Sequence, residues 1–191
     1  GAAARHPGWT ALPAVRGRGF EALRAGDHVP DFGGPGLHPT AGATAVGARE
    51  ILIAFNVELA GADLDLARRI AAAVRERDGG LPAVRAMGVP LVGRDRGGPG
   101  DRRGGPPEDR VQVSMNLLDW RVTPPAEAYG AVAALAGRHG ARVEASEVVG
   151  LAPAGAFDGV DPADLRLRGA LDDLLLESRL LQALTTSKEI R

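Results

Sequence analysis

After residue 50, the hydrophobic pattern of the chain switches repeatedly between segments typical of strands and segments typical of helices. Val111–Leu117 alternates apolar and polar residues throughout, as a half-buried strand does. From Ile51 onward the expected order is strand, helix, strand, strand, helix, strand. This order is the ferredoxin-like split βαβ plan, in which both helices cover one face of an antiparallel sheet. We therefore predict an α+β domain of the βαββαβ type whose other sheet face is open.

Capping and breaker residues place the helices. Asp63 is expected to cap a helix that runs to Arg77, because Gly79 and Gly80 follow. Thr123 is expected to cap a second helix that runs to about residue 139, with Pro124 in its first position. The other expected strands cover residues 51–57, 83–92 and 143–151. The second of these contains both glycine and proline, and we expect it at an edge of the sheet.

Leucines recur at helical spacing near the C-terminus and predict one long additional helix from Pro162 to Leu184. Before residue 50 the pattern is weak, and prolines interrupt it. We therefore divide the chain into residues 1–48, an irregular arm with a glycine-rich loop, and residues 49–191, an α+β domain with the terminal helix.

Charge and composition argue against several classes of function. The chain has 23 basic and 24 acidic residues, a balance that gives no electrostatic reason to expect nucleic acid or an anionic membrane as partner. It has no cysteine, which excludes disulfides, thiolate metal ligands and cysteine nucleophiles. No apolar run approaches the roughly 18–20 residues that span a bilayer, and residues 1–12 lack the apolar core of a signal peptide. We expect a soluble, cytoplasmic protein.

Polar side chains are expected on the open face of the sheet. Strand parity sends the apolar residues of 111–117 toward the helices and Gln112, Ser114 and Asn116 toward the open face. Asn56 has the corresponding parity in the first strand. Amides can hydrogen-bond a polar ligand without carrying charge, so Asn56, Gln112 and Asn116 are candidate cleft residues. The alternatives are polar groups that face water and a surface that binds a partner protein.

A loop rich in glycine and proline precedes the first strand. It comprises Gly33, Gly34, Pro35, Gly36, Leu37, His38, Pro39, Thr40, Ala41 and Gly42. Glycine lets backbone N–H groups approach an anionic ligand, and a plain structural loop is the alternative interpretation. The loop is neither a Walker motif nor a dinucleotide fingerprint, and its single histidine is weak support for catalysis or metal binding. We predict no metal site.

A second glycine-rich segment, residues 94–110, has no large apolar residue to bury. This composition indicates a solvated hairpin loop, and the alternative is a basic loop that contacts an anion through Arg102 and Arg103. No pair of nucleophile and base is recognisable elsewhere. The residues by themselves therefore predict a ferredoxin-like domain with a polar open face.

Several strings of the sequence, taken in order, resemble glutamate formiminotransferases. They are Val29–Gly33, His38–Arg49, Leu52–Asn56, Gln112–Asp119 and Val148–Pro153. The resemblance implies transfer of a formimino group from N-formimino-L-glutamate to N5 of tetrahydrofolate during histidine breakdown. It also implies a transferase module of two α/β subdomains that hold the folate, a co-substrate, between their sheets.

In that family the glycine-rich loop binds folate, so the resemblance implies that Gly33–Gly42 contacts the folate. It further implies that residues 1–48 are the end of the N-terminal subdomain and that residues 49–191 form the C-terminal subdomain. The general base of the family is a histidine of the N-terminal subdomain, and no residue of this chain matches its motif. We therefore expect no catalytic residue in this chain, and activity only together with an N-terminal half.

A non-catalytic folate or amino-acid sensor is the alternative function, because ferredoxin-like domains often serve as regulatory modules. An RNA-binding module is disfavoured, since the predicted inner strands lack the surface aromatic residues on which bases stack. An isolated half would expose a sheet face that attracts other proteins. We therefore also predict a homo-oligomer or a protein partner that covers this face.

Overall fold

A computed structural model of the chain describes residues 31–33, 38–44, 46–91 and 110–189. The chain divides into two compact units, Gly1–Arg49 and Glu50–Arg191. The helices and strands that follow all belong to the second unit. Residues 94–109 of the predicted loop, which include Arg102 and Arg103, lie outside the described residues.

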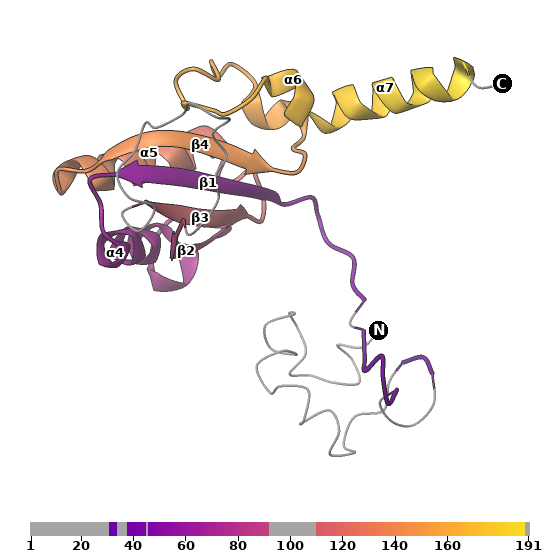
Figure 1. Cartoon of the computed structure of the whole chain (residues 1–191), viewed down its shortest axis with the longest axis horizontal. Coiled ribbons are helices and arrows are strands. Elements are labelled where there is room, and N and C mark those ends of the chain that lie inside the picture. The colour runs from indigo at the N-terminus through magenta and orange to yellow at the C-terminus, as the bar shows by residue number, and fades with distance from the viewer. Residues whose placement is uncertain (1–30, 34–37, 45, 92–109, 190–191) are drawn as a thin grey trace, which may run out of the picture. The chain divides into compact units, whose positions relative to one another are not determined.

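The second unit is built on a four-stranded sheet in the order β2-β3-β1-β4 (Figure 1). All three neighbouring pairs of strands are antiparallel. The strands are β1 (Ile53–Ala60), β2 (Val84–Pro90), β3 (Val111–Leu117) and β4 (Arg142–Val149). The predicted split βαβ plan is confirmed, and so is the edge position of the strand that carries Gly88 and Pro90.

Two helices, α4 (Leu64–Val74) and α5 (Pro125–Arg138), pack against the sheet and against each other. Their buried residues form one hydrophobic core with the apolar face of the strands; Phe55 and Met115, for example, are cross-strand partners within it. Asp63 caps α4 as predicted, because its carboxylate accepts a hydrogen bond of 2.7 Å from the backbone N–H of Leu66. Because the helices cover the apolar face of the sheet, the polar residues of the strands point away from the core.

Gly88 sets how closely α4 approaches β2. A Cβ atom at this position would lie 2.4 Å from the backbone nitrogen of Arg68 and 2.5 Å from the backbone carbon of Ala67, both in α4. Such distances are far inside van der Waals contact, so no other residue fits without moving the helix. The glycine that weakens β2 as a strand is therefore required by the packing of the layers.

Among the boundaries that differ from the prediction, three have a physical cause in the structure. The first strand runs three residues further than expected, to Ala60, because it pairs with both β3 and β4. Helix α4 ends at Val74 rather than Arg77, since Arg75 is extended and forms a bridge with Leu81 before the short 3₁₀ turn Glu76–Asp78. Thr123 does not cap α5; its hydroxyl donates instead to the carbonyl of Pro82 at 2.7 Å.

The predicted helix from Pro162 to Leu184 is wrong over its first half. After the 3₁₀ turn Ala154–Phe157, the chain follows the free edge of β4, and the backbone N–H and C=O of Ser146 bond to Arg166 and Arg168 respectively. Gly169 has φ +81°, and the residues around it are not helical. Only the short α6 (Leu171–Leu174) and α7 (Leu176–Glu189) are helical.

The leucines that suggested one continuous stripe divide between two roles. Leu167, Leu171 and Leu174 pack against the core, whereas Leu181 and Leu184 of α7 are largely exposed. Pairing with the edge of β4 interrupts the helix, because edge-strand backbone groups and helix compete for the same hydrogen-bonding atoms. Among the described residues, no helix has the length and apolar character needed to cross a membrane.

Candidate functional site

The face of the sheet opposite the helices carries the polar residues that strand parity predicted. In the register of β1 and β3, Asn56 lies opposite Ser114 and Glu58 lies opposite Gln112. Asn116 lies two pairs further along and therefore on the same face, opposite Ala54. The two central strands therefore place Asn56, Gln112 and Asn116 on one face of the sheet. The three residues lie at different pairs of the β1–β3 ladder and do not converge on one point.

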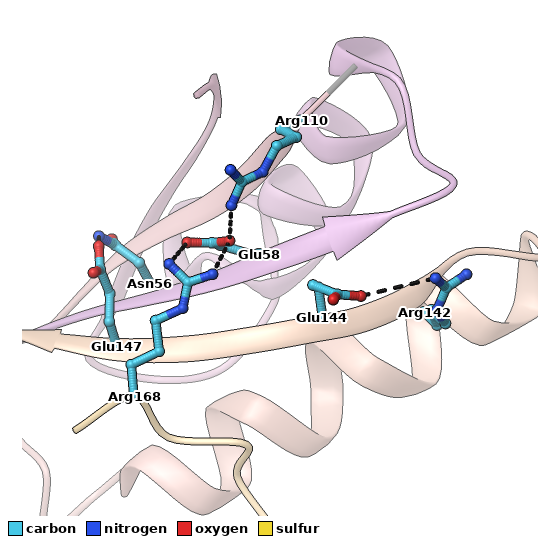
Figure 2. A network of polar contacts seen from close by, with 7 residues as sticks. All are labelled: Asn56, Glu58, Arg110, Arg142, Glu144, Glu147 and Arg168. Atoms are coloured by element: carbon cyan, nitrogen blue, oxygen red, sulfur yellow. Dashed lines mark hydrogen bonds and ion pairs between the residues drawn. The ribbon is translucent and has the colours of Figure 1, made fainter. Parts of the chain in front are cut away.

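Burial separates the three candidate residues. Asn116 is exposed, whereas Asn56 and Gln112 are only 7% and 8% exposed. Asn56 is held in place by β4, since its Nδ2 donates a hydrogen bond of 2.9 Å to Oε1 of Glu147 (Figure 2). Polar groups that simply faced water would not be buried to this extent.

Glu58 is the centre of an ion cluster on this face. Arg168 contacts both of its carboxylate oxygens at 2.7 Å, a bidentate arrangement, and Arg110 donates to Oε2 at 3.0 Å. Figure 2 shows the carboxylate between the two guanidinium groups, beside Asn56 and Glu147. The Glu58 side chain is 6% exposed, while those of Arg110 and Arg168 are 39% and 38% exposed. The cluster is therefore buried at its carboxylate and open at its cations.

This cluster was not predicted from the sequence. Glu58 shares the parity of Asn56, but its two partners lie 52 and 110 residues away in the chain. No local spacing connects a strand residue with such distant arginines. Arg168 also fell in the segment that was expected to be helical, where its side chain would have had no defined relation to the sheet.

Gln112 contributes an unpaired acceptor next to the cluster. Its Oε1 atom is buried and has no hydrogen-bond partner in the part of the chain that the structure describes. A buried oxygen without a partner is unfavourable by about 1–3 kcal/mol, so proteins rarely retain one without a use. Glu58 and Gln112 are cross-strand partners, which places this oxygen beside the ion cluster.

The described groups on this face are able to bind a charged or polar ligand. The face carries two guanidinium groups and the carboxylates of Glu58 and Glu147, and the amides add uncharged donors and acceptors. The carboxylate of Glu58 forms ion pairs with Arg110 and Arg168. Within the described ranges, no group of three or more His, Asp or Glu side chains is arranged to hold a metal ion.

The glycine-rich loop belongs to the first unit. His38 forms a bridge with Gly42, and its Nδ1 atom accepts hydrogen bonds from the backbone N–H groups of Thr40 and Ala41 at 3.3 and 3.0 Å. The imidazole therefore stabilises a local turn. Gly34, Pro35, Gly36 and Leu37 lie outside the described residues. A folate-binding role for the loop stays a prediction.

Comparison with known proteins adds independent information. Residues 106–163 match the family model of the formiminotransferase domain. Over 187 residues the chain is 35% identical to a glutamate formimidoyltransferase of Thermoplasma acidophilum, which covers 95% of this chain and 57% of that protein. A glutamate formimidoyltransferase of Streptococcus pyogenes is 39% identical over 150 residues, 78% of this chain and 44% of that protein.

A longer relative carries a second named activity. The formimidoyltransferase-cyclodeaminase of Gallus gallus is 37% identical over 163 residues, which are 80% of this chain and 27% of that protein. The chain spans about half the length of the two glutamate formimidoyltransferases that it matches. The resemblance inferred from the sequence strings is thereby confirmed.

Proposed function

We propose that this relative of the formiminotransferases binds tetrahydrofolate and forms the folate-binding part of a glutamate formimidoyltransferase. The substrates would be tetrahydrofolate and N-formimino-L-glutamate, as in histidine breakdown. The names of relatives that are 35–39% identical over most of this chain support this class of reaction. The partly exposed guanidinium groups of Arg110 and Arg168, beside the unpaired Oε1 of Gln112, support a ligand site on the open face, and this is the structural observation on which the proposal rests.

In the proposed reaction, N5 of tetrahydrofolate attacks the formimino carbon of N-formimino-glutamate. A bond forms between N5 and that carbon, and the bond from the carbon to the glutamate nitrogen breaks. The proton of N5 is taken up by a base, and the departing glutamate nitrogen receives a proton, so that 5-formimino-tetrahydrofolate and glutamate leave. A positioned base contributes about 10²–10⁴-fold to such a step, and holding two substrates together contributes further.

We assign binding and orientation, rather than the base, to this chain. The open face supplies cationic and amide groups that hold polar ligands, and the loop Gly33–Gly42 is proposed to contact the folate. No residue of the sequence matches the catalytic histidine motif of the family, and Glu58 is engaged by two arginines. The base would therefore come from an N-terminal region supplied by another polypeptide or by a larger protein.

Calorimetric titration of the chain with folinate, a stable reduced folate, tests the binding part of the proposal. We expect saturable heat at a stoichiometry of one site per chain. The transferase part is tested by assaying the chain alone and mixed with the N-terminal region of a relative such as the Thermoplasma acidophilum protein. Activity only in the mixture is expected, and absence of both binding and activity in the mixture would refute the assignment.

A second function is favoured by one specific observation. The described open face offers binding groups without an unpaired acid–base pair, as a non-catalytic folate or amino-acid sensor would. This alternative predicts binding of folinate or glutamate without turnover, even after the N-terminal region is added. The mixed assay therefore discriminates the two functions.

A further inference from the structure

The ion cluster on the open face has more hydrogen-bond donors than it uses. A guanidinium group has five N–H donors, and among the described residues Arg110 uses one of its nitrogens, to bond Glu58. The side chain is 39% exposed, so its remaining donors are accessible from the open face. Arg168, by contrast, directs two nitrogens onto the same carboxylate. Arg110 is therefore the cation that is oriented by Glu58 and still able to bind an anion.

Gln112 presents the complementary group two residues away. Arg110 and Gln112 lie on the same side of the strand, because alternate residues share a face and both neighbour Glu58. Same-face neighbours on a strand are about 7 Å apart. The buried Oε1 of Gln112 accepts no hydrogen bond within the described ranges, and a ligand N–H would supply the missing partner.

Together these groups match a ligand that joins a carboxylate to an N–H group within a few bonds. We propose that Arg110, oriented by Glu58 and Arg168, binds a carboxylate of a glutamyl group, while Gln112 Oε1 accepts a hydrogen bond from the N–H on the α-carbon of that group. The proposal deepens the proposed function and rests on it. The partly exposed guanidinium of Arg110 favours this anionic ligand over a neutral one.

Both proposed substrates contain this chemistry. N-formimino-L-glutamate is a glutamyl group with a substituted nitrogen, and the tail of tetrahydrofolate is a glutamyl group joined through an amide. The two sources are distinguished with three probes on the full chain: folinate, N-formyl-L-glutamate, which lacks a pterin, and 6-methyltetrahydropterin, which lacks the glutamyl group. Dissociation constants are measured by calorimetry for each probe, with competition against folinate where a probe binds weakly.

Two variants change the subsite in different ways. Arg110→Gln removes the cation, and we expect folinate or N-formyl-L-glutamate to bind about 10- to 100-fold more weakly. Gln112→Met removes the acceptor while keeping the size of the side chain, and we expect weakening of about tenfold. Neither variant is expected to change the affinity for 6-methyltetrahydropterin. The glutamyl probe whose affinity falls identifies the source of the group.

Stability separates a binding role from a structural one. Replacing a buried, unpaired oxygen by an apolar group relieves an unfavourable interaction, so Gln112→Met should unfold at the same urea midpoint as wild type or at a higher one. Weaker binding in an equally stable protein would not arise from a structural role. If Arg110→Gln is poorly folded, Gln112→Met alone decides. The control is Arg142→Gln, which also removes one positive charge, but from an exposed arginine outside the cluster (Figure 2). This variant should bind all three probes as wild type does.

The outcomes are distinct. In one outcome, wild type binds folinate, and both variants bind folinate and N-formyl-L-glutamate as tightly as wild type does. This result would overturn the subsite and leave the proposed function standing. Wild type that binds none of the three probes, alone or with the N-terminal region of a relative, would overturn the proposed function and the subsite together. Selective loss of either glutamyl probe supports the subsite.

Discussion

Arg168 contacts both carboxylate oxygens of Glu58 at 2.7 Å, although the two residues are separated by 110 positions in the chain. Arg168 is placed by the segment that pairs with Ser146 at the edge of β4, whereas Glu58 lies on the central strand β1. The ion pair therefore fastens the C-terminal part of the unit across the open face. Because the Glu58 side chain is 6% exposed, its charge depends on the two arginines for compensation.

The substitution Glu58→Gln should destabilise the protein. It keeps the shape of the side chain but leaves two guanidinium groups together without a counter-charge. We expect a loss of about 1–3 kcal/mol in the free energy of unfolding, below the 3–5 kcal/mol of fully buried pairs, because water reaches both arginines. Urea denaturation followed by circular dichroism measures it.

The matched control for this change is Glu144→Gln. Glu144 lies 3.8 Å from Arg142, and both side chains are exposed. Its removal should alter stability by less than about 0.5 kcal/mol. Equal losses for Glu58→Gln and Glu144→Gln would contradict the special position of Glu58.

Gly88→Ala should push α4 away from β2, since the new methyl group would meet helix backbone at 2.4 Å. Backbone cannot rotate away as a side chain can, so we expect a loss of roughly 1–3 kcal/mol or more. Gly130→Ala is the control. Gly130 is exposed in α5 with nothing within 4 Å of an added Cβ, and alanine there should stabilise by roughly 0.5–1 kcal/mol. Thermal melts of both variants should shift in opposite directions.

Thr123→Val removes a buried hydroxyl that donates to the carbonyl of Pro82 at 2.7 Å. The carbonyl then loses its partner without gaining water, which costs about 1–3 kcal/mol. The exposed Thr185, whose hydroxyl bonds the carbonyl of Leu181 within α7, provides the comparison, and Thr185→Val should change stability by less than about 0.5 kcal/mol. If Thr123→Val were neutral, this hydroxyl would not help to join α5 to the start of β2.

Ser146→Ala should loosen the C-terminal segment without disturbing the centre of the sheet. The Ser146 hydroxyl is fully buried and donates to the carbonyl of Leu165 at 2.6 Å. Without it, the adjacent backbone bond from the N–H of Arg168 to Ser146 opens more often. We expect faster amide hydrogen exchange at Arg168 and unchanged exchange at Val113 in β3. Unchanged exchange at both amides would show that backbone pairing alone holds the segment.

Local pattern was sufficient to predict the order of strands and helices. Alternation in Val111–Leu117 and the cap at Asp63 are both properties of a few consecutive residues, and the structure confirms both. The edge position of β2 also followed from its own Gly88 and Pro90. Predicting these features does not require knowledge of contacts between residues that are distant in the sequence.

The larger failures involve partners distant in the chain. The leucine spacing after Pro162 favours a helix, but Ser146 binds the backbone of this segment instead. Thr123 has the composition of a cap, yet its hydroxyl finds the carbonyl of Pro82. Parity identified the open face but not the ion cluster, because Glu58 meets its arginines only after the sheet and the C-terminal segment have come together.

Residues 166–168 occupy one border of the sheet by bonding Ser146, which leaves β2 as the other border within the described residues. Pro90 lacks a backbone N–H, so β2 offers an incomplete template for strand addition by another chain. Ordered growth into an intermolecular β-ribbon is therefore discouraged at both margins.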